Sequence, residues 1–528
     1  MSTKFKINIP PMELSPDHYI KSARVDIKTL EKLVNISNNP VFFDEDCTLY
    51  KRGKKITSLE VEQLKKKGYL LIWITNDGEP YKEGSKEEFI YDTKAKIETT
   101  LLEFFNVFSE EDVKKGARTL SYFDGKDLFK PQLNPLQREG AQKLRQQIMS
   151  DSGKISIVKE ALYNFLRQIN SDMSISSIRS IGNVDKSINV LANKKMDELS
   201  YRIVSHTTMT TLMFLAAISR IQSERVKRGA QLSSKRLLEK DEKKTFDKDK
   251  RSQYLEELIL DASLGCIFHA FGYYHQEIRK LMDKEIKDFL QPDGSYIKDE
   301  SKILPEKELI LIKKYPLVAY NILSSEINRD VSAIADNIIK FHGSFLDGSG
   351  FPDRKSQGLG DDKFKHPIHE LTRLFSIVNF FDIMIHRTPN RLPVRRTEIV
   401  EYLLKNSVDN LDPLTEVDKQ GIWDIDTTTK QTGLFDGYLV SEFLSSIHLF
   451  KIGESVLIRN DLNQKCFLGT VIRHNPNLPH RPILEVKLKD KVYKINLTDR
   501  DKKEWYIDDL HETVSIIEEE PSFDQFED

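Results

Sequence analysis

The residues best suited to chemistry lie in one short segment, 341–352, which reads Phe-His-Gly-Ser-Phe-Leu-Asp-Gly-Ser-Gly-Phe-Pro. A predicted amphipathic helix runs into this segment, and one face of it carries Ala335, Ile338, Ile339 and His342. An imidazole at such a helix end either binds a metal ion or packs in the core as a satisfied histidine. Gly348 and Gly350 can adopt positive φ, so the segment by itself also fits a simple tight loop.

The stretch Asp347 to Pro352 resembles the signature of the HD-GYP family, in which His-His-Glu is followed two residues later by Asp-Gly-Ser-Gly-Tyr-Pro; here Phe351 replaces the tyrosine. Other landmarks of the family follow in the same order within 198–405: a helix with His206, the stretch 264–272 around His269, the stretch 373–382, and Pro389-Asn-Arg391. The resemblance implies an all-helical HD-type domain. In active relatives its histidines and aspartates hold two or three ions of iron, manganese or a similar metal, which activate water to hydrolyse cyclic di-GMP.

Compared with the family's ligand set, this chain keeps three histidines: His206, His269 and His342. The other ligand positions are replaced. Ala270 stands for the aspartate of the His-Asp pair and Tyr315 for the next histidine. The remaining three substitutes, for the second histidine and the glutamate of His-His-Glu and for the final aspartate, are Gly343, Ser344 and Asn379.

These replacements matter electrostatically, because two dications bring four positive charges and the surviving ligands are neutral imidazoles without an aligned carboxylate. Tyr273 also replaces a lysine that helps active relatives to grip substrate phosphate, whereas Arg391 aligns with a retained basic position of the same purpose. We therefore expect no metal cluster, no bound cofactor and no catalytic residue.

The resulting hypothesis is a catalytically inactive HD-GYP-like signalling protein that acts by binding in bacterial cyclic di-GMP signalling. Its partner would be a cyclic dinucleotide or a protein such as a diguanylate cyclase domain, which the Gly-Tyr-Pro loop of the family has been linked to binding. The expected contact residues are Asp347, Gly348, Ser349, Gly350, Phe351, Pro352 and Arg391.

Two further readings stay open. A working phosphodiesterase would hold a single divalent iron, manganese or zinc ion through His206, His269 and His342, as some catalytic zinc sites do. A sensor without hydrolysis would instead bind phosphates through Arg387 and Arg391. Four more histidines could in principle serve as ligands, but they share no helical face and fit surface or core positions: His275, His366, His369 and His386.

The elements that must position these residues divide the chain into five parts. A small α+β domain is expected at 1–90, with strands at 5–9 and 69–75 and one helix at 58–67, followed by a helical connector at 91–197. The degenerate HD-GYP domain occupies 198–445 and contains a charged insertion at 235–251. Four predicted strands then form a small β-barrel-like domain at 446–510, and an acidic, disordered tail closes the sequence at 511–528.

Composition limits the remaining classes. The 528 residues exceed what one core usually serves, so a multidomain and mainly α protein is expected. With 80 Lys and Arg against 82 Asp and Glu, no net field recruits nucleic acid. The three cysteines are widely spaced, and no apolar run approaches the roughly 20 residues that span a bilayer. These features favour a cytoplasmic protein, and the family adds the expectation of a homodimer through the connector.

Overall fold

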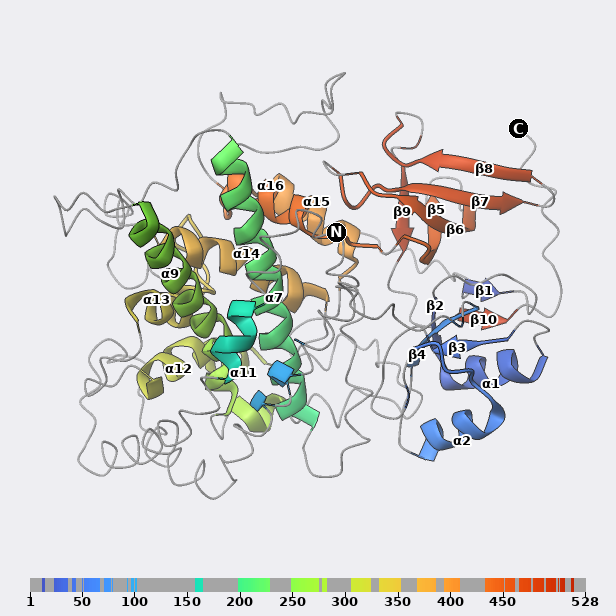
Figure 1. Cartoon of the computed structure of the whole chain (residues 1–528), viewed down its shortest axis with the longest axis horizontal. Helices are drawn as coiled ribbons and strands as arrows, with labels where there is room; N and C mark the ends of the chain where they lie inside the picture. The colour runs from blue at the N-terminus through green and yellow to red at the C-terminus, as the bar shows by residue number, and fades with distance from the viewer. Residues whose placement is uncertain are drawn as a thin grey trace.

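The structure is a computed structural model that describes residues 12–14, 23–36, 40–43, 50, 52–66, 71–76, 78, 93, 96–98, 100–101, 157–164, 198–227, 248–274, 278–282, 305–323, 332–352, 368–385, 394–408, 433–450, 452–460, 465–475, 478–488, 491–499, 502, 504–508 and 514–516. The larger part is helical, a five-stranded antiparallel sheet follows it, and a small group of strands and two helices precedes it (Figure 1). The prediction of a mainly α chain with a smaller β part is confirmed.

The helical part has α14 (Glu370–Ile385) near its centre. Contacts join α14 to α7 (Glu198–Lys227), α13 (Ala333–Phe341), α15 (Arg396–Lys405) and α16 (Gly437–Ser446). Its other elements are α9 (Lys248–Phe268), the 3₁₀ turn η2 (Phe271–Tyr274), α11 (Glu306–Ile312) and α12 (Tyr315–Leu323). Ten residues of α14 are buried, so this helix is apolar nearly all round, as a central helix must be.

Local sequence explains two of these helices. Ser332 caps α13 by accepting the Ala335 N–H, and the buried face of the helix carries Ile334, Ala335, Ile338 and Ile339. In α7 a buried run of threonines is tolerated because the hydroxyls donate to backbone carbonyls one turn earlier, as Thr211 does to Thr207 at 2.6 Å.

The close approach of α9 and α13 depends on Gly265. A Cβ at this position would lie 2.8 Å from the Ala335 Cα and 3.1 Å from the Ile338 Cβ. Any larger residue would push the two helices apart, and with them His269 at the end of α9 and His342 at the end of α13.

The sheet contains β5 (Ser455–Asn460), β6 (Lys465–Arg473), β7 (Ile483–Leu488), β8 (Lys491–Asn496) and β9 (Trp505–Asp508), in the order β8-β7-β6-β5-β9. The four predicted strands are confirmed, and β9 was not predicted. Among the described residues β8 pairs only with β7 and β9 only with β5, so the expected barrel is an open sheet there.

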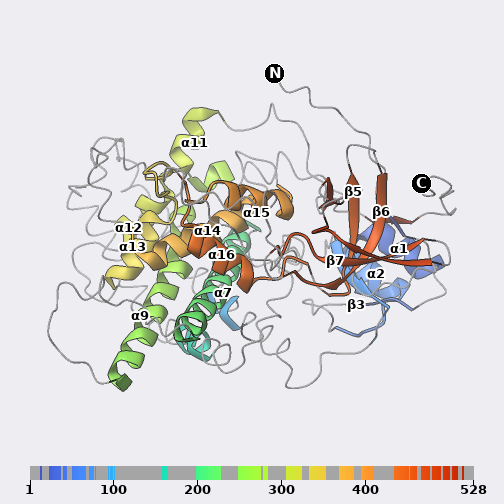
Figure 2. The same ribbon diagram turned by 90° about the horizontal axis from the view of Figure 1, so that it is seen from above.

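The sheet and the helices share one hydrophobic core. Val456, Ile458, Val471 and Leu484 of the sheet pack in the same buried cluster as Phe381, Phe443 and the other core residues of the helices. Both views place the sheet directly beside α15 and α16 (Figures 1 and 2). Buried residues of 91–197, among them Ile97 and Leu162, belong to this core as well.

Buried ion pairs also join α15 to the sheet. Arg396, 7% exposed, contacts Glu454 at 3.3 Å and the Leu449 carbonyl, and its guanidinium lies 4.5 Å from the centre of the Phe450 ring. Arg395 lies 3.6 Å from Asp508, which Arg459 contacts at 2.9 Å. Apart from Arg395, these paired charges are buried, so the helical part and the sheet pack as one body.

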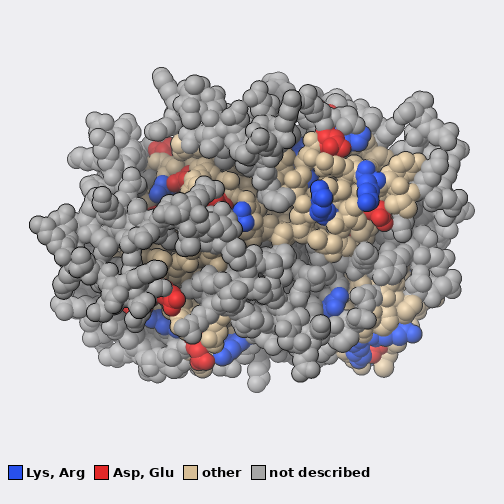
Figure 3. All heavy atoms as spheres, turned by 45° about the horizontal axis from the view of Figure 1, so that its top comes forward, with Lys and Arg blue, Asp and Glu red and all other residues tan. Residues whose placement is uncertain are grey.

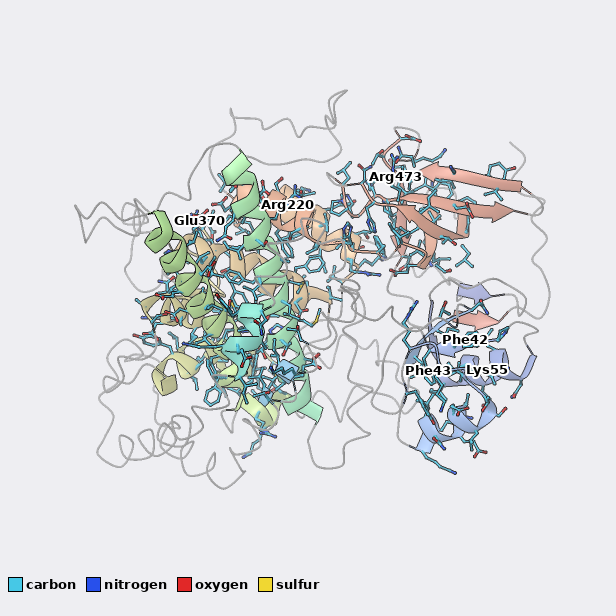
Figure 4. The ribbon with its side chains drawn as sticks, in the orientation of Figure 1. Phe42, Phe43, Lys55, Arg220, Glu370 and Arg473 are labelled. Carbon is cyan, nitrogen blue, oxygen red and sulfur yellow. The ribbon has the colours of Figure 1, made fainter. Side chains whose placement is uncertain are left out.

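The N-terminal part contains β1 (Met12–Leu14), β2 (Ala23–Asp26), α1 (Ile27–Ile36), β3 (Phe42–Phe43), α2 (Ser58–Lys66) and β4 (Leu71–Thr75). Strands β2, β4 and β3 form a sheet, and Phe42 on β3 bridges to Lys55, both labelled in Figure 4. The predicted helix at 58–67 and strand at 69–75 are confirmed as α2 and β4. The expectation of one helix was wrong, because α1 forms as well.

Two further sequence expectations need correction or fall outside the described residues. The predicted disordered tail, 511–528, contains strand β10 (Val514–Ile516), which pairs with β1. The charged insertion, 235–251, ends inside α9, which begins at Lys248; its residues 235–247 lie outside the described residues, as does the strand predicted at 5–9.

Surface charge is mixed on the face shown in Figure 3, where the described Lys and Arg side chains alternate with Asp and Glu. Arg220 of α7, labelled in Figure 4, illustrates this pairing because its Nε lies 3.4 Å from Glu442 of α16. Within the described residues no helix is both long enough and apolar enough to cross a bilayer.

Candidate functional site

Three histidines from three helices meet beside α14. His206 lies on α7, His269 directly follows α9, and His342 caps α13. The ring centre of His269 is 5.0 Å from that of His206 and 4.8 Å from that of His342. The structure therefore brings together the three histidines that the resemblance had suggested as residual metal ligands.

Both ring nitrogens of His342 are occupied. Its Nδ1 lies 3.0 Å from the carbonyl oxygens of Ile338 and Ile339, which can only accept, so Nδ1 carries the proton. Complete burial lowers the pKa of His342 to about 4 and keeps the ring neutral. The bare Nε2 then accepts the hydroxyl proton of Tyr315, at 2.6 Å. A metal ion at this nitrogen would have to displace Tyr315.

His269 is also neutral and has a defined tautomer. Its Nδ1 donates to the Cys266 carbonyl at 2.5 Å, and burial, followed by the neighbouring His342 and His206, lowers its pKa well below the usual value. The unprotonated Nε2 faces His206 Nε2 at 3.0 Å. His269 is fully buried, whereas the His206 side chain keeps 16% of its exposure.

The carboxylate of Asp382 contacts the other side of His206. Asp382, His206, His269 and the Cys266 carbonyl thus form a continuous line of short contacts, called the histidine row below. Asp382 Oδ2 lies 2.5 Å from His206 Nδ1, and the residue is fully buried on α14. The sequence comparison missed Asp382 because it tested only Asn379 on this helix. The available signal was helical spacing, since residues three apart share a face and Asp382 lies one turn beyond Asn379.

The histidine row needs more protons than two neutral imidazoles can supply. It runs from Asp382 through His206 and His269 to the Cys266 carbonyl. It contains three short contacts, and each needs one proton or cation between its two acceptors. Two neutral imidazoles supply only two N–H groups. The row is therefore complete only with one additional positive charge, either a proton or a single metal ion.

The positions that the resemblance aligns with metal ligands carry other groups. Ala270 is fully buried in the core. Asn379, 3% exposed, interacts with both His269 and Tyr315, while its Oδ1 accepts no hydrogen bond from the described residues. Tyr273 stacks on Tyr315 with ring centres 4.1 Å apart. Around Tyr315 the site therefore presents aromatic rings.

Phe351 packs directly against Gly343. A Cβ at Gly343 would lie 2.6 Å from the Phe351 ring, so the ring takes the space that a side chain at 343 would need. Phe351 also contacts Tyr315, with ring centres 5.9 Å apart. Ser344 is buried and donates to the Pro352 carbonyl at 2.9 Å. The residues present do not fit a two-metal centre, because packed protein groups occupy its ligand positions.

The glycine-rich loop is held tightly by its own backbone. Gly348 and Gly350 have φ of 84° and 92°, as the sequence predicts. Phe351 N–H donates to the Gly343 carbonyl at 2.8 Å, and Asp347 Oδ1 accepts both the N–H and the hydroxyl of Ser349. The loop is thus preformed, with Gly348 and Pro352 buried and its other four residues partly exposed.

Several candidate residues do not join the site. His369 accepts the Leu371 N–H at 3.1 Å and so caps α14. The candidates Arg387, Arg391, His275, His366 and His386 have no described side chain. Across the described part of the chain, no set of three or more His, Cys, Asp or Glu side chains is arranged to hold a metal ion.

Comparison of the chain with known proteins adds no relative to this geometry. No family model matches it, and no curated protein or solved structure does.

Proposed function

We propose that residues 198–445 form a degenerate HD-GYP domain that works by binding, not by hydrolysis, in bacterial cyclic di-GMP signalling. The observation that carries the proposal is the hydrogen bond from the Tyr315 hydroxyl to His342 Nε2, at 2.6 Å. This hydrogen bond occupies His342 Nε2, the nitrogen that would bind a metal ion in an active relative.

Electrostatics supports the same conclusion. A two-metal centre needs several carboxylates to balance the ions. The only carboxylate that the described residues bring into contact with the histidine row is Asp382, and it is bound to His206 Nδ1. Such a carboxylate orients an imidazole and is no ligand itself.

The binding surface in this proposal is the loop from Asp347 to Pro352, because its conformation is fixed before any partner arrives. A preformed loop loses little entropy on association. Its partner is a protein such as a diguanylate cyclase domain or a cyclic dinucleotide.

The first experiment measures the metal content of the purified full-length protein by elemental analysis, together with cyclic di-GMP turnover and calorimetric binding. We expect no two-ion occupancy and no turnover above a protein-free blank. Two bound ions with hydrolysis would sink the proposal. Binding of cyclic di-GMP without turnover would favour a nucleotide sensor over a protein-binding module.

The second experiment tests Tyr315 itself. Tyr315→His should let His342 take up added Mn²⁺ or Zn²⁺ but should not restore turnover, since Ala270, Gly343 and Asn379 remain. Tyr320→His, on the same helix and away from the site, is the matched control. Turnover in the Tyr315 variant alone would show that one residue blocks an otherwise intact enzyme.

A single-ion phosphodiesterase is the second candidate, because the histidine row needs one more positive charge, which a metal ion would supply as well as a proton. An ion between His206 Nε2 and His269 Nε2, with Asp382 behind His206, would supply the missing positive charge. This candidate predicts one tightly bound ion per chain, lost in His269→Ala and retained in His369→Ala.

A further inference from the structure

A strand from the end of the sequence lies within the N-terminal part. Figure 1 shows the red strand β10 beside the blue β1, apart from the other strands of the C-terminal sheet. The two pair in parallel, with Met12 opposite Val514, Glu13 opposite Ser515 and Leu14 opposite Ile516. Strand β10 also contacts β2 and α1.

The N-terminal part has a hydrophobic core of its own. Leu30, Leu33, Phe43, Leu64 and Ile74 are buried, but none of them belongs to the core that joins the helices to the C-terminal sheet. Of the element pairs with several contacts, those that link this part to the rest of the described chain all involve β10. Within the described residues, β10 is thus the segment from the C-terminal half of the chain that packs most extensively on the N-terminal part.

From these contacts we infer that the chain's own segment Val514–Ile516 occupies an edge of the N-terminal part, where it pairs with β1 and contacts β2 and α1. The segment suits the role, because Val514 and Ile516 are β-branched and favour extended backbone.

The same copy of the chain can supply the strand. Asp508, the last residue of β9, is fixed in the sheet by Arg459 at 2.9 Å. Six peptide steps separate Asp508 from Val514 in the sequence, and they span at most about 20 Å. The tether is short, so the effective concentration of β10 at its own edge is high.

This contact opens more easily than the core. A parallel ladder of three residues is marginal by itself and depends on the packing around it. Local contacts of this kind exchange at free energies well below that of global unfolding. Strand β10 thus acts as a clasp that holds or releases the N-terminal part while the helical body stays folded.

Disulfide trapping tests the contact. Neighbouring strands place paired Cα atoms about 5 Å apart, within the range that a disulfide bridges. In a Cys47→Ser, Cys466→Ser background, Glu13→Cys with Ser515→Cys should oxidise within one chain. Leu59→Cys with Ser515→Cys is the matched control, because Leu59 is 60% exposed on α2 and away from the ladder.

The disulfides that form show whether the edge binds the chain's own β10 or that of a second copy. An intramolecular disulfide well above the control supports the chain's own strand. A disulfide that links two copies, found on mixing the two single-cysteine variants, would replace it with strand exchange between molecules. No disulfide above the control would overturn the proposed edge.

Hydrogen exchange tests the clasp. Proline cannot donate to a ladder, and alternate residues of a parallel strand donate to a given neighbour, so Val514→Pro and Ser515→Pro are both made. At least one should raise amide exchange in β2, β4 and α1 about tenfold or more, with α7 and α14 unchanged. Ser522→Pro, beyond the ladder, is the control. Unchanged exchange in both variants would show that β10 holds nothing.

Discussion

At the scale of single residues, the site depends on which group satisfies each imidazole nitrogen. The Tyr315 hydroxyl donates to His342 and the Asp382 carboxylate contacts His206, so both of these buried imidazoles have polar partners in the helical core. Buried donors and acceptors cost far more when unpaired than their hydrogen bonds contribute when formed. Stability measurements can therefore report on the site without any assay of function.

Tyr315→Phe should lower the free energy of unfolding by about 1–3 kcal/mol, because it leaves His342 Nε2 buried without a donor. Urea unfolding followed by circular dichroism measures this. Tyr402→Phe, at a 42% exposed position on α15, should change the free energy by less than about 0.5 kcal/mol. Equal effects of the two variants would contradict the structural role of the Tyr315 hydroxyl.

Asp382→Ala should cost about 3 kcal/mol or more, because it removes the buried partner of His206 Nδ1. Asp336→Ala provides a comparison within the helical part. Burial raises the pKa of Asp336 to about 6, so its ionised form is already disfavoured at this half-buried position. Its loss should cost less than about 1 kcal/mol at pH 7. A small effect at Asp382 would mean that the contact with His206 contributes little.

The sequence could suggest the three histidines but not the groups that satisfy them. His206, His269 and His342 were named from the order of family landmarks, and the structure brings them together. Asp382 was missed, and so was the role of Tyr315 as the donor to His342, because a ligand-by-ligand comparison asks only what each position has lost. It cannot show which neighbouring side chain has moved into the space, as Phe351 does over Gly343.

At the scale of elements, the strands that could be predicted are those with a regular pattern of apolar residues. Strands β5 to β8 have clear apolar patterns and were found, whereas β9 is four residues long and follows a charged stretch, so it carries little pattern of its own. For this reason the sequence does not show that β5 lies between β6 and β9 in the sheet. The charges that dock α15 on the sheet were equally hidden, since sequence does not show which arginines are buried.

Arg396→Ala should destabilise the protein by about 3–5 kcal/mol, because Glu454 would remain buried without its partner. The double variant Arg396→Met, Glu454→Leu should recover much of the loss, since it removes both charges. Lys66→Ala tests an exposed pair with Glu62 and should cost less than about 0.5 kcal/mol. Failure of the double variant to recover stability would show that Arg396 acts through its other contacts.

At the scale of the whole molecule, buried histidines make stability depend on pH. Burial lowers the pKa of His480 to about 3 and that of His448 to about 4, and it also lowers the pKa of His474. The unfolded chain binds protons to these groups near pH 6.5, so it gains protons first as the pH falls. The stability they provide is present above pH 6.5 and is lost progressively as the pH falls toward 4.

We therefore expect the urea midpoint to fall between pH 7.5 and pH 5. His480 alone contributes about 2 kcal/mol to this loss at pH 5, because it is fully buried. His480→Gln cannot take up this proton and should show a flatter pH profile. Asp336, with its raised pKa, acts in the opposite direction over pH 4–6 but is a single half-buried group. An unchanged profile in the glutamine variant would place the dependence elsewhere.

The shared core of helices and sheet limits how this protein can have been assembled in evolution. Val456, Ile458 and Leu484 of the sheet cover apolar surface of the helices. Arg396 on α15 forms a buried ion pair with Glu454 at the start of the sheet. Recombination that joined the helical segment to a different C-terminal module would expose that surface and leave Arg396 without its partner Glu454. The two segments should therefore have been inherited as one unit, and a gene carrying only one of them should yield an insoluble product.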